Sequence, residues 1–579
     1  MSHNDALLFI GFAMVALIAL TTLGARRLRT PQSILLVLVG AALAFAPGLP
    51  AVRLNPDLML VLMLPPLLYT SGVGMSWRGF RNNLRPITMM AVGCVLFTAA
   101  AVAAVMHWVF QMPWAVGFVL GAVVSPPDAV APMAIARRLN VPAGILVVLE
   151  GEGLVNDATA LILFSVAVAS VMTGDGVPLV HAVGTFAVIV VAEVAWGLLV
   201  GWGLLQLRTW ARNSEVEMVL ALLTPFAAFW PPHFLGGSGV LAAVTAGLYV
   251  SWNGRRLITP ATRLQGFFVW GLTVYLIEGV VFFLTGLQAR VVMEGPEAGE
   301  WAHMLEAAGI IVVVVIVVRF VWVFTAGYLP ARLRRRREGA PTPPSWRGMF
   351  LVGFTGIRGV VSLVAALSIP EMVGDAEFPD RDLILFVTFA VILVTLVGQG
   401  AALPRLIRLL KIDRAGMAEN RANKRNEVTA RIAGIQSALD RLAELEKSGA
   451  SARLVENLRR SEEDRRVDYV QTGDESIEGA PVAEAAAIQL QLVEAERSSI
   501  NRQYTDGRLS DEARRRIERE LDLEDARVRH SCEGATVSDA GVLEETSEAA
   551  VIDELGAIGQ IAGNERLDGS RDTPPASGR

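Results

Sequence analysis

Cysteine and histidine are scarce in this chain, and their scarcity narrows the chemistry. The 579 residues include two cysteines and six histidines. Cys94 lies in an apolar stretch and Cys532 near the polar end of the chain, so we expect no structural disulfide between them. Neither cysteine has a second ligand at metal-binding spacing, and the histidines are scattered. We therefore predict no resident metal site, and no sequence motif indicates a cofactor.

Charge is the second scarcity. Charged residues make up 18% of the chain, against 53% hydrophobic residues. Apolar runs of about 20 residues recur before residue 410, and each is long enough to cross the hydrocarbon core of a bilayer. The first five residues lack the Lys or Arg of a cleavable signal peptide, so we expect the first run to remain as a membrane helix. The composition predicts an all-α polytopic membrane protein.

The apolar runs predict about thirteen membrane-spanning helices, and the loop arginines test this count. With the N-terminus outside, the cytoplasmic loops hold nineteen arginines, whereas the outer loops hold only Arg53, Arg290 and Arg381. Because positive residues favour the cytoplasmic side, we predict a cell-membrane protein with an outside N-terminus and a cytoplasmic C-terminus. We interpret the arginine run at 334–337 as a topology anchor or lipid contact, not as a nucleic-acid site. The predicted spans are 6–25, 32–47, 57–72, 86–108, 114–136, 143–173, 178–206, 216–234, 237–252, 266–289, 307–329, 348–370 and 383–408.

The chain changes character after residue 410, where Glu, Arg, Ala and Leu become frequent. Apolar residues at helical spacing predict an amphipathic helix over 418–447. A helical hairpin is predicted over 482–504 and 511–529, with a turn at Asp506-Gly507 and Ser510 as N-cap. We therefore divide the chain into a transmembrane domain (1–410), a cytoplasmic helical domain (411–563) and a disordered tail (564–579). For the cytoplasmic part, regulation, assembly and simple packing all remain open.

Three carboxylates lie within eight residues of the sixth predicted span. They are Glu150, Glu152 and Asp157, and Asn156 directly precedes the last of them. A charge in hydrocarbon costs roughly 2.5–3.5 kcal/mol on insertion scales, so something must compensate. The usual compensations are a cation, a proton or an internal arginine. This segment therefore indicates ion or proton movement.

Two predicted spans contain helix breaks. Pro126 and Pro127 remove two backbone donors in the fifth span, directly before Asp128. The twelfth span contains Gly353, Gly356 and Gly359 around Arg358. A broken helix at membrane depth faces protein or a water-filled cavity, where its freed carbonyls can serve an ion. Because these spans are seven apart, we predict two inverted six-helix repeats joined by one helix, with crossed broken helices.

Depth along the predicted helices indicates which charges can meet. At a rise of about 1.5 Å per residue, Glu152, Arg358 and Asp128 each lie about 14–15 Å from the cytoplasmic end of their spans, and Asp157 about 21 Å. We therefore expect an ion pair between Glu152 and Arg358, which leaves Asp157 free to titrate. Glu150 is an alternative partner for Arg358. Weaker candidates for a functional part are the other charges within spans, namely Glu193, Glu278 and Arg319.

Several segments resemble the bacterial sodium/proton antiporters of the first monovalent cation:proton antiporter family, relatives of the animal sodium/proton exchangers. The similar segments appear in the family's order over most of residues 60–400 and are Leu64-Pro65-Pro66-Leu67-Leu68-Tyr69, Ser125-Pro126-Pro127-Asp128-Ala129-Val130, Leu149 to Ala160, Ser238-Gly239-Val240-Leu241-Ala242 and Arg358-Gly359-Val360-Val361-Ser362-Leu363.

The resemblance implies a homodimer with a mobile ion-binding core and a dimerisation bundle. The family's Asn-Asp pair maps to Asn156 and Asp157, and its aspartate binds either the cation or the proton. Its Glu–Arg pair maps to Glu152 and Arg358. Members with Asn before the Asp are generally electroneutral, which implies an exchange of one cation for one proton.

Three positions depart from the family pattern. Many members carry Ser where Gly153 stands, and that hydroxyl can ligate the ion. Many carry Thr where Pro127 stands; there the ligand is the backbone carbonyl, which proline retains. Some carry Glu where this chain has Thr70. These departures bear on which ion is preferred and leave the assignment of Asp157 intact.

The sequence therefore predicts a secondary antiporter that exchanges Na⁺ or Li⁺ for H⁺, with both ions competing for Asp157. The neutralised core can cross between inward- and outward-open states, whereas a bare carboxylate would pay desolvation. The nearest alternative is a K⁺/H⁺ antiporter. Two remote alternatives belong to other classes: a cation channel, and an intramembrane aspartyl protease that would use Asp128 and Asp157. The contexts Pro-Asp and Asn-Asp differ from the Tyr-Asp and Gly-x-Gly-Asp contexts that such a protease needs.

Overall fold

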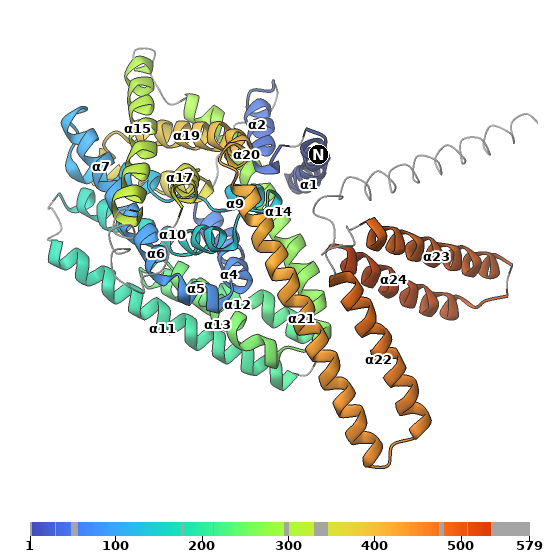
Figure 1. The fold of residues 1–579 in the computed structure, drawn as a ribbon. Helices are drawn as coiled ribbons and strands as arrows, with labels where there is room; N and C mark the ends of the chain where they lie inside the picture. The colour runs from blue at the N-terminus through green and yellow to red at the C-terminus, as the bar shows by residue number, and fades with distance from the viewer. Residues whose placement is uncertain are drawn as a thin grey trace, which may run out of the picture. The chain divides into compact units, whose positions relative to one another are not determined.

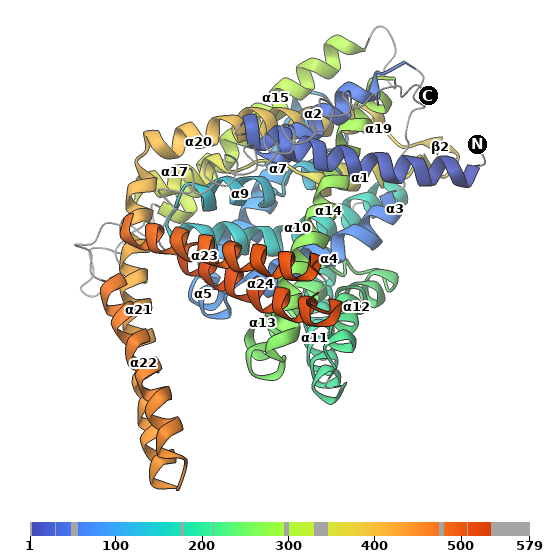
Figure 2. The same cartoon turned by 90° about the vertical axis from the view of Figure 1, so that its right-hand side faces the viewer.

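The structure is a computed structural model that describes residues 3–28, 30–47, 56–174, 179–211, 213–294, 300–328, 345–473, 480–506 and 508–533. The chain divides into two compact units, Met1–Glu419 and Asn420–Arg579. The described part is almost entirely helical (Figures 1 and 2). The exception is a small antiparallel hairpin of β1 (Met372–Val373) and β2 (Ala376–Glu377), in which Met372 pairs with Glu377.

The helices of the first unit include short π-helical stretches, labelled η. In chain order they are α1 (His3–Leu28), α2 (Gln32–Ala44), α3 (Pro56–Leu58), η1 (Met59–Met63), α4 (Leu64–Gly74), α5 (Trp77–Asn82), α6 (Leu84–Thr88), η2 (Met89–Cys94), α7 (Val95–Trp108), α8 (Trp114–Val124), α9 (Val130–Arg138), α10 (Ala143–Thr173), α11 (Leu179–Ala211), α12 (Ser214–Phe234), α13 (Val240–Leu257), α14 (Pro260–Glu294), α15 (Trp301–Trp322), η3 (Val323–Tyr328), α17 (Trp346–Phe354), α18 (Val360–Leu367), α19 (Arg381–Leu393), η4 (Val394–Gln399) and α20 (Gly400–Leu409).

Six helical stretches in the described residues are long and apolar enough to cross a membrane: Leu84–Trp108, Ala143–Thr173, Gly184–Ala211, Ala261–Glu294, Trp301–Gly327 and Arg381–Leu409. They overlap six of the predicted spans. Shorter apolar helices lie where the first, second, third and fifth spans are predicted. A polytopic helical membrane protein is therefore confirmed, whereas the count of thirteen spans and the inverted repeat stay predictions.

Local sequence sets several helix ends around the site. α8 ends at Val124 because Pro126 and Pro127 cannot donate the next backbone hydrogen bonds. α10 begins after Pro142, whose extended backbone starts the helix. It ends at Gly174, which takes the left-handed conformation with φ of 72°. The long helix α10 packs beside the two shorter helices α8 and α9.

Small residues allow two helix pairs to pack closely. A Cβ built on Gly72 of α4 would lie 2.8 Å from the carbonyl oxygen of Val244 and 3.3 Å from the Cα of Gly247, both on α13. The same relation holds for Gly40 of α2, where a Cβ would lie 3.1 Å from the Cα of Gly286 on α14. In a membrane, such close backbone contact replaces the hydrophobic force that is missing between helices in lipid.

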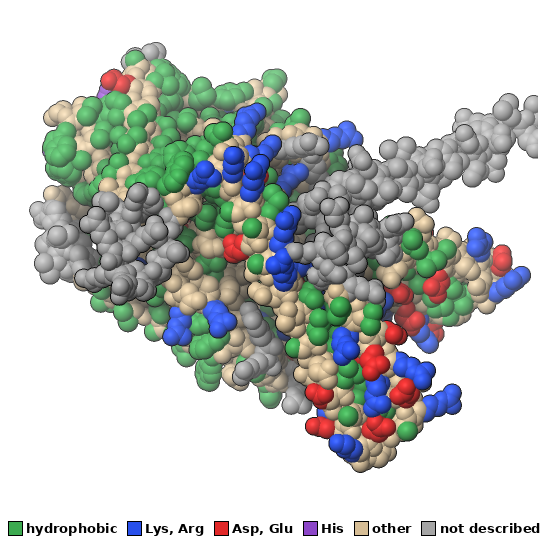
Figure 3. Space-filling view, in the orientation of Figure 1, with side chains coloured by type: hydrophobic (Ala, Val, Ile, Leu, Met, Phe, Trp, Pro, Cys, Tyr) green, Lys and Arg blue, Asp and Glu red, His purple; other side chains and the backbone are tan. Residues whose placement is uncertain are grey.

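The second unit contains most of α21 (Ile412–Lys447), followed by α22 (Ala452–Gly473), α23 (Ala480–Thr505) and α24 (Asp511–Glu533). Helices over 418–447, 482–504 and 511–529 were expected from the sequence, and the structure contains them with slightly wider bounds. α22 is an addition. Figure 3 shows charged side chains gathered on the tail helices, whereas hydrophobic side chains cover much of the visible face of the first unit.

α23 and α24 form the expected helical hairpin. Arg497 of α23 donates to Asp522 of α24 across 2.9 Å, and Leu490 packs against the buried Val528. The Ser510 hydroxyl accepts a hydrogen bond from the backbone N–H of Ala513 across 3.3 Å, which confirms this residue as an N-cap. Gly507 and the tail predicted over 564–579 lie outside the described residues.

Candidate ion site

The two interrupted helices cross at their unwound segments. Residues 125–129 separate α8 from α9, and residues 355–359 separate α17 from α18. At the crossing, the backbone N–H of Asp128 donates to the carbonyl of Ile357 across 2.7 Å. A Cβ on Gly359 would lie 2.7 Å from the carboxylate of Asp128, so a side chain at position 359 would clash with this carboxylate. The two breaks are therefore in contact, as the predicted crossing of the broken helices requires.

Arg358 holds the carbonyls that the break in α8 leaves free. Its guanidinium is buried and donates to the carbonyls of Val124 (2.9 Å), Ser125 (3.3 Å) and Gly356. Its backbone N–H donates to the hydroxyl of Thr395 across 3.0 Å. A cation at the C-terminal end of a helix also interacts favourably with the helix dipole. Arg358 therefore holds the two unwound segments together through hydrogen bonds to their backbone carbonyls.

Glu152 has a different partner from the predicted one. Its carboxylate accepts from Arg319 of α15, with Nη1–Oε1 at 2.5 Å and Nη2–Oε2 at 2.9 Å. Both side chains are almost fully buried, at 2% and 1% exposure. Arg319 also donates to the carbonyl of Val352. The predicted Glu152–Arg358 pair is therefore wrong, because depth along a span does not say which way a side chain points.

The pair Asn156 and Asp157 lies beside the crossing, on α10. Asn156 is fully buried, and its Nδ2 donates to the carbonyl of Pro127 across 2.6 Å. Asp157 is half-buried, and within the described part of the chain no donor reaches its carboxylate. The charges of Asp157 and Asp128 are close enough to interact. Asn156 thus ties α10 to the break, and Asp157 keeps its oxygens available.

Asp128 is only partly satisfied. Its Oδ1 accepts from the backbone N–H of Val130 across 3.0 Å, which makes an Asx turn directly before α9. Its Oδ2 is buried and has no hydrogen-bond partner among the described residues. A buried carboxylate oxygen without a donor is costly, and a bound cation or proton would remove that cost.

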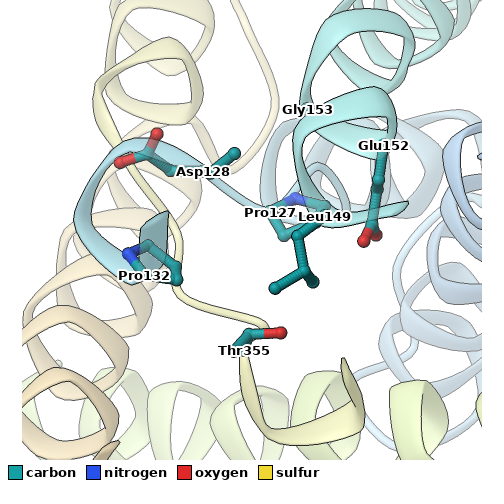
Figure 4. A pocket seen from close by; sticks show the side chains of 8 residues that line it. Pro127, Asp128, Pro132, Leu149, Glu152, Gly153 and Thr355 are labelled. Atoms are coloured by element: carbon teal, nitrogen blue, oxygen red, sulfur yellow. The ribbon is translucent and has the colours of Figure 1, made fainter. Parts of the chain in front are cut away.

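A small cavity opens at the crossing (Figure 4). Its volume is about 10 Å³, which is about the space of one water-sized sphere. The wall combines the unwound segment, one face of α10 and the end of α17, with carboxylates from two of its residues. Its lining residues are Pro127, Asp128, Ala129, Pro132, Leu149, Glu152, Gly153 and Thr355. Four of the predicted site residues, Pro127, Asp128, Glu152 and Gly153, therefore line one cavity, whereas Asn156 and Asp157 are not among its lining residues.

The secondary candidates divide between the site and its surroundings. Glu150 bonds Arg137 across 3.0 Å, so the structure does not make it the alternative partner of Arg358. The Thr70 hydroxyl donates within its own helix, to the carbonyls of Pro66 and Leu67. A Cβ on Gly153 would lie 2.6 Å from that of Ala129, so this glycine lets α10 approach the break.

Glu278 comes to the site from a different helix. It lies half-buried on α14, close enough to Asp128 for their charges to interact. Its neighbours Ile277 and Val281 belong to an apolar cluster with Val360, the residue directly after Gly359. The carboxylate of Glu278 therefore lies near the crossing, and no hydrogen-bond donor to it is found in the described ranges.

Two further buried charges have structural partners. Glu193 of α11 accepts from the backbone N–H groups of Ser238 (2.6 Å), Gly239 (2.9 Å) and Leu241 (3.1 Å), and from the Ser238 hydroxyl. It caps the start of α13. Arg208, one of the nineteen arginines that the sequence analysis assigned to cytoplasmic loops, is buried at the end of α11 and donates to the Thr224 hydroxyl across 2.7 Å. Nothing in the sequence indicated that this arginine turns inward.

The chain is similar to known proteins over most of its length. The family model described as "Sodium/hydrogen exchanger, transmembrane" matches residues 13–409. An uncharacterized Na⁺/H⁺ exchanger of Mycobacterium tuberculosis is 33% identical over 91% of this chain and 97% of its own length. A sodium, potassium, lithium and rubidium/H⁺ antiporter of Bacillus subtilis is 31% identical over 65% of this chain and 58% of its own length. The solved sodium proton antiporter MjNhaP1 of Methanocaldococcus jannaschii shares the fold, with a TM-score of 0.54 and 18% identity over 71% of this chain and all of its own.

Proposed function

Since the chain belongs to the sodium/hydrogen exchanger family, we propose that it exchanges Na⁺ or Li⁺ for H⁺ by competition of the two ions for Asp157. As a Na⁺/H⁺ exchanger it is a secondary transporter and not an enzyme. The observation that carries the proposal is the half-buried Asp157 carboxylate, which no donor reaches within the described residues. Burial without a partner disfavours the bare charge, so this carboxylate gains by binding a cation or a proton.

Competition at one carboxylate couples the two fluxes. A sodium ion and a proton cannot both neutralise Asp157, so arrival of one releases the other. The neutral form can cross the membrane interior, whereas the charged form pays desolvation. Asp128 is close enough to Asp157 for their charges to interact, and Asn156 bonds the carbonyl of Pro127 at the same break. We propose that these groups add oxygens of the kind that hard cations prefer. Because Asn156 cannot titrate, we propose that the exchange is electroneutral, one cation for one proton.

The supporting residues have separate roles in this proposal. Arg358 and the Glu152–Arg319 pair hold the crossing in shape, since each has a full set of partners. Glu278, Thr70 and Gly153 border the path and adjust which ion fits. Two inverted six-helix repeats, thirteen spans, a homodimer and a cytoplasmic C-terminus complete the architecture that we propose. Crossed broken helices support it, because transporters with inverted repeats build their sites from such pairs.

The second candidate is K⁺/H⁺ exchange. It is favoured by the likeness to the Bacillus subtilis antiporter, whose name includes potassium, lithium and rubidium. It is also favoured by the glycine at position 153, because no side-chain oxygen at that position narrows the site. Sodium remains the first choice, since the matching family model and the mycobacterial relative are both described as sodium/proton exchangers.

Purified protein in liposomes that contain a pH-sensitive dye tests the proposal. We expect Na⁺ or Li⁺ added outside to drive proton movement at saturable rates, and K⁺ to do so weakly. A larger response to K⁺ than to Na⁺ would support the second candidate. No response to any monovalent cation would overturn both, and a single-channel current in planar bilayers would point to a channel.

A further inference from the structure

The helix that leads into the second unit begins against the transport helices. α21 starts at Ile412, after a break at Lys411, whose φ of 56° is left-handed. Ile412 is 4% exposed and belongs to one apolar cluster with residues of α9, α17 and α20. The first two turns of α21, residues 412–419, belong to the first compact unit. They are therefore part of the transport unit and not of the tail.

Gly416 makes the closest of these contacts. It is buried, and a Cβ built on it would overlap the carbonyl oxygen of Asn140. It would also lie 3.2 Å from the backbone nitrogen of Pro142. The helix therefore rests directly on the backbone of the loop 139–142, and only glycine permits this approach.

That loop connects the two helices that carry the site aspartates. Asp128 lies just before α9, Asp157 lies within α10, and the loop 139–142 joins the two helices. Asn140 adopts a left-handed φ of 53°, which is uncommon for a non-glycine residue and needs support from its surroundings. Arg137 and Glu150 bridge the same hairpin across 3.0 Å. Gly416 therefore contacts the loop that connects α9, which follows Asp128, to α10, which carries Asp157.

The docked position carries a cost as well. Oδ1 of Asp413, on the docked turn, is buried and has no hydrogen-bond partner among the residues that the structure describes. Leaving such an atom unpaired opposes docking. α21 then continues without interruption to Lys447, so whatever holds or moves the tail acts on the docked turn through a single helix.

We propose that residues 412–419 brace the α9–α10 loop and thereby couple the tail to the transport step. The proposal rests on the proposed function, because it assigns the brace to the movement of the ion-carrying helices. Docked, the first turns of α21 hold the loop and keep α9 and α10 in register. Undocked, the joint between these helices loosens, and turnover falls although the ion ligands stay in place.

The test compares two glycines on the same helix. Gly416→Ala and Gly416→Val force the helix off the loop, by increasing amounts. Gly434→Ala and Gly434→Val are the matched controls, because a Cβ there meets nothing within 4 Å and both pairs change helix propensity alike. Each full-length variant is measured for Na⁺-driven proton flux per folded protein in liposomes, and for hydrogen exchange at residues 136–146.

We expect Gly416→Val to lower turnover roughly tenfold, which lies within the coupling range measured between distant sites, and Gly416→Ala to lower it less. The Na⁺ concentration for half-maximal flux should stay unchanged, hydrogen exchange should quicken at residues 136–146, and the Gly434 variants should match the unaltered protein. Unchanged hydrogen exchange in Gly416→Val would overturn the docking. Quickened exchange with normal turnover, or a shift in half-maximal Na⁺, would overturn the brace. If the unaltered protein shows no cation-driven flux, the proposed function fails, whereas hydrogen exchange still decides the docking.

Discussion

Two carboxylates on consecutive helices, Glu193 and Asp157, show what separates a structural charge from the proposed transport charge. Glu193, at the junction of α11 and α13, accepts from three backbone N–H groups and one hydroxyl. Asp157, beside the crossing of the broken helices, has no donor among the described residues. The first carboxylate is stabilised in its charged form by the fold. The second has its oxygens free for an ion from solution, so the number of donors, and not burial alone, is the reason for which we propose Asp157 as the transport carboxylate.

The largest effect is expected at the unsatisfied carboxylate. Asp157→Asn should abolish cation-driven proton flux, because an amide cannot exchange a proton for a cation. The fold should survive, since Asp157 makes no hydrogen bond with the described residues. Flux in liposomes and the thermal unfolding temperature measure the two effects. Residual flux close to that of the unaltered protein would place the carrier elsewhere, with Asp128 the next candidate.

The ion pair beneath the site should matter to stability. Arg319→Ala strands the buried Glu152 carboxylate, at a cost of roughly 3–5 kcal/mol. The double change Glu152→Gln with Arg319→Gln removes both charges and should recover much of that loss. Thermal unfolding in detergent measures both. If the double variant is no more stable than Arg319→Ala, the pairing seen here does not contribute as we argue.

The capped junction gives the contrasting result. Glu193→Gln keeps the size of the side chain but weakens charge-assisted hydrogen bonds, each worth roughly 1.5–3 kcal/mol. We expect a lower unfolding temperature and normal flux per folded molecule. Asp157→Asn measured in parallel should show the reverse pattern. A lasting loss of flux in folded Glu193→Gln would break the distinction between the two carboxylates.

The smallest effect concerns membrane potential. If one cation exchanges for one proton, flux should not respond to an imposed potential. A net movement of one charge would instead add about 2.3 kcal/mol per 100 mV to the driving force. Potassium gradients with valinomycin set the potential in liposomes, and the initial rate of Na⁺-driven flux is the readout. A clear dependence would implicate Asp128 or Glu278 as a second titrating carboxylate.

The sequence indicated the candidate site through residues that are expensive at membrane depth. Pro126 and Pro127 predicted the break, and the close spacing of Glu150, Glu152 and Asp157 indicated ion or proton movement at α10. These residues are informative because hydrocarbon strongly penalises a charge or an unpaired backbone group. Few structural roles other than ion binding or internal pairing can account for them. Arg319 was visible by the same rule, but nothing in the chain linked it to Glu152.

What the sequence determined by itself is therefore the class of protein, the breaks and the identity of the unusual residues, because each follows from local chemistry in an apolar solvent. Only the tertiary structure decided the partners. It paired Glu152 with Arg319, turned Arg358 toward the carbonyls of α8, used Glu193 as a cap and set Gly416 on Asn140. Each of these depends on the rotation of one helix about its axis relative to another. Packing across the whole molecule sets that rotation, and no single segment encodes it.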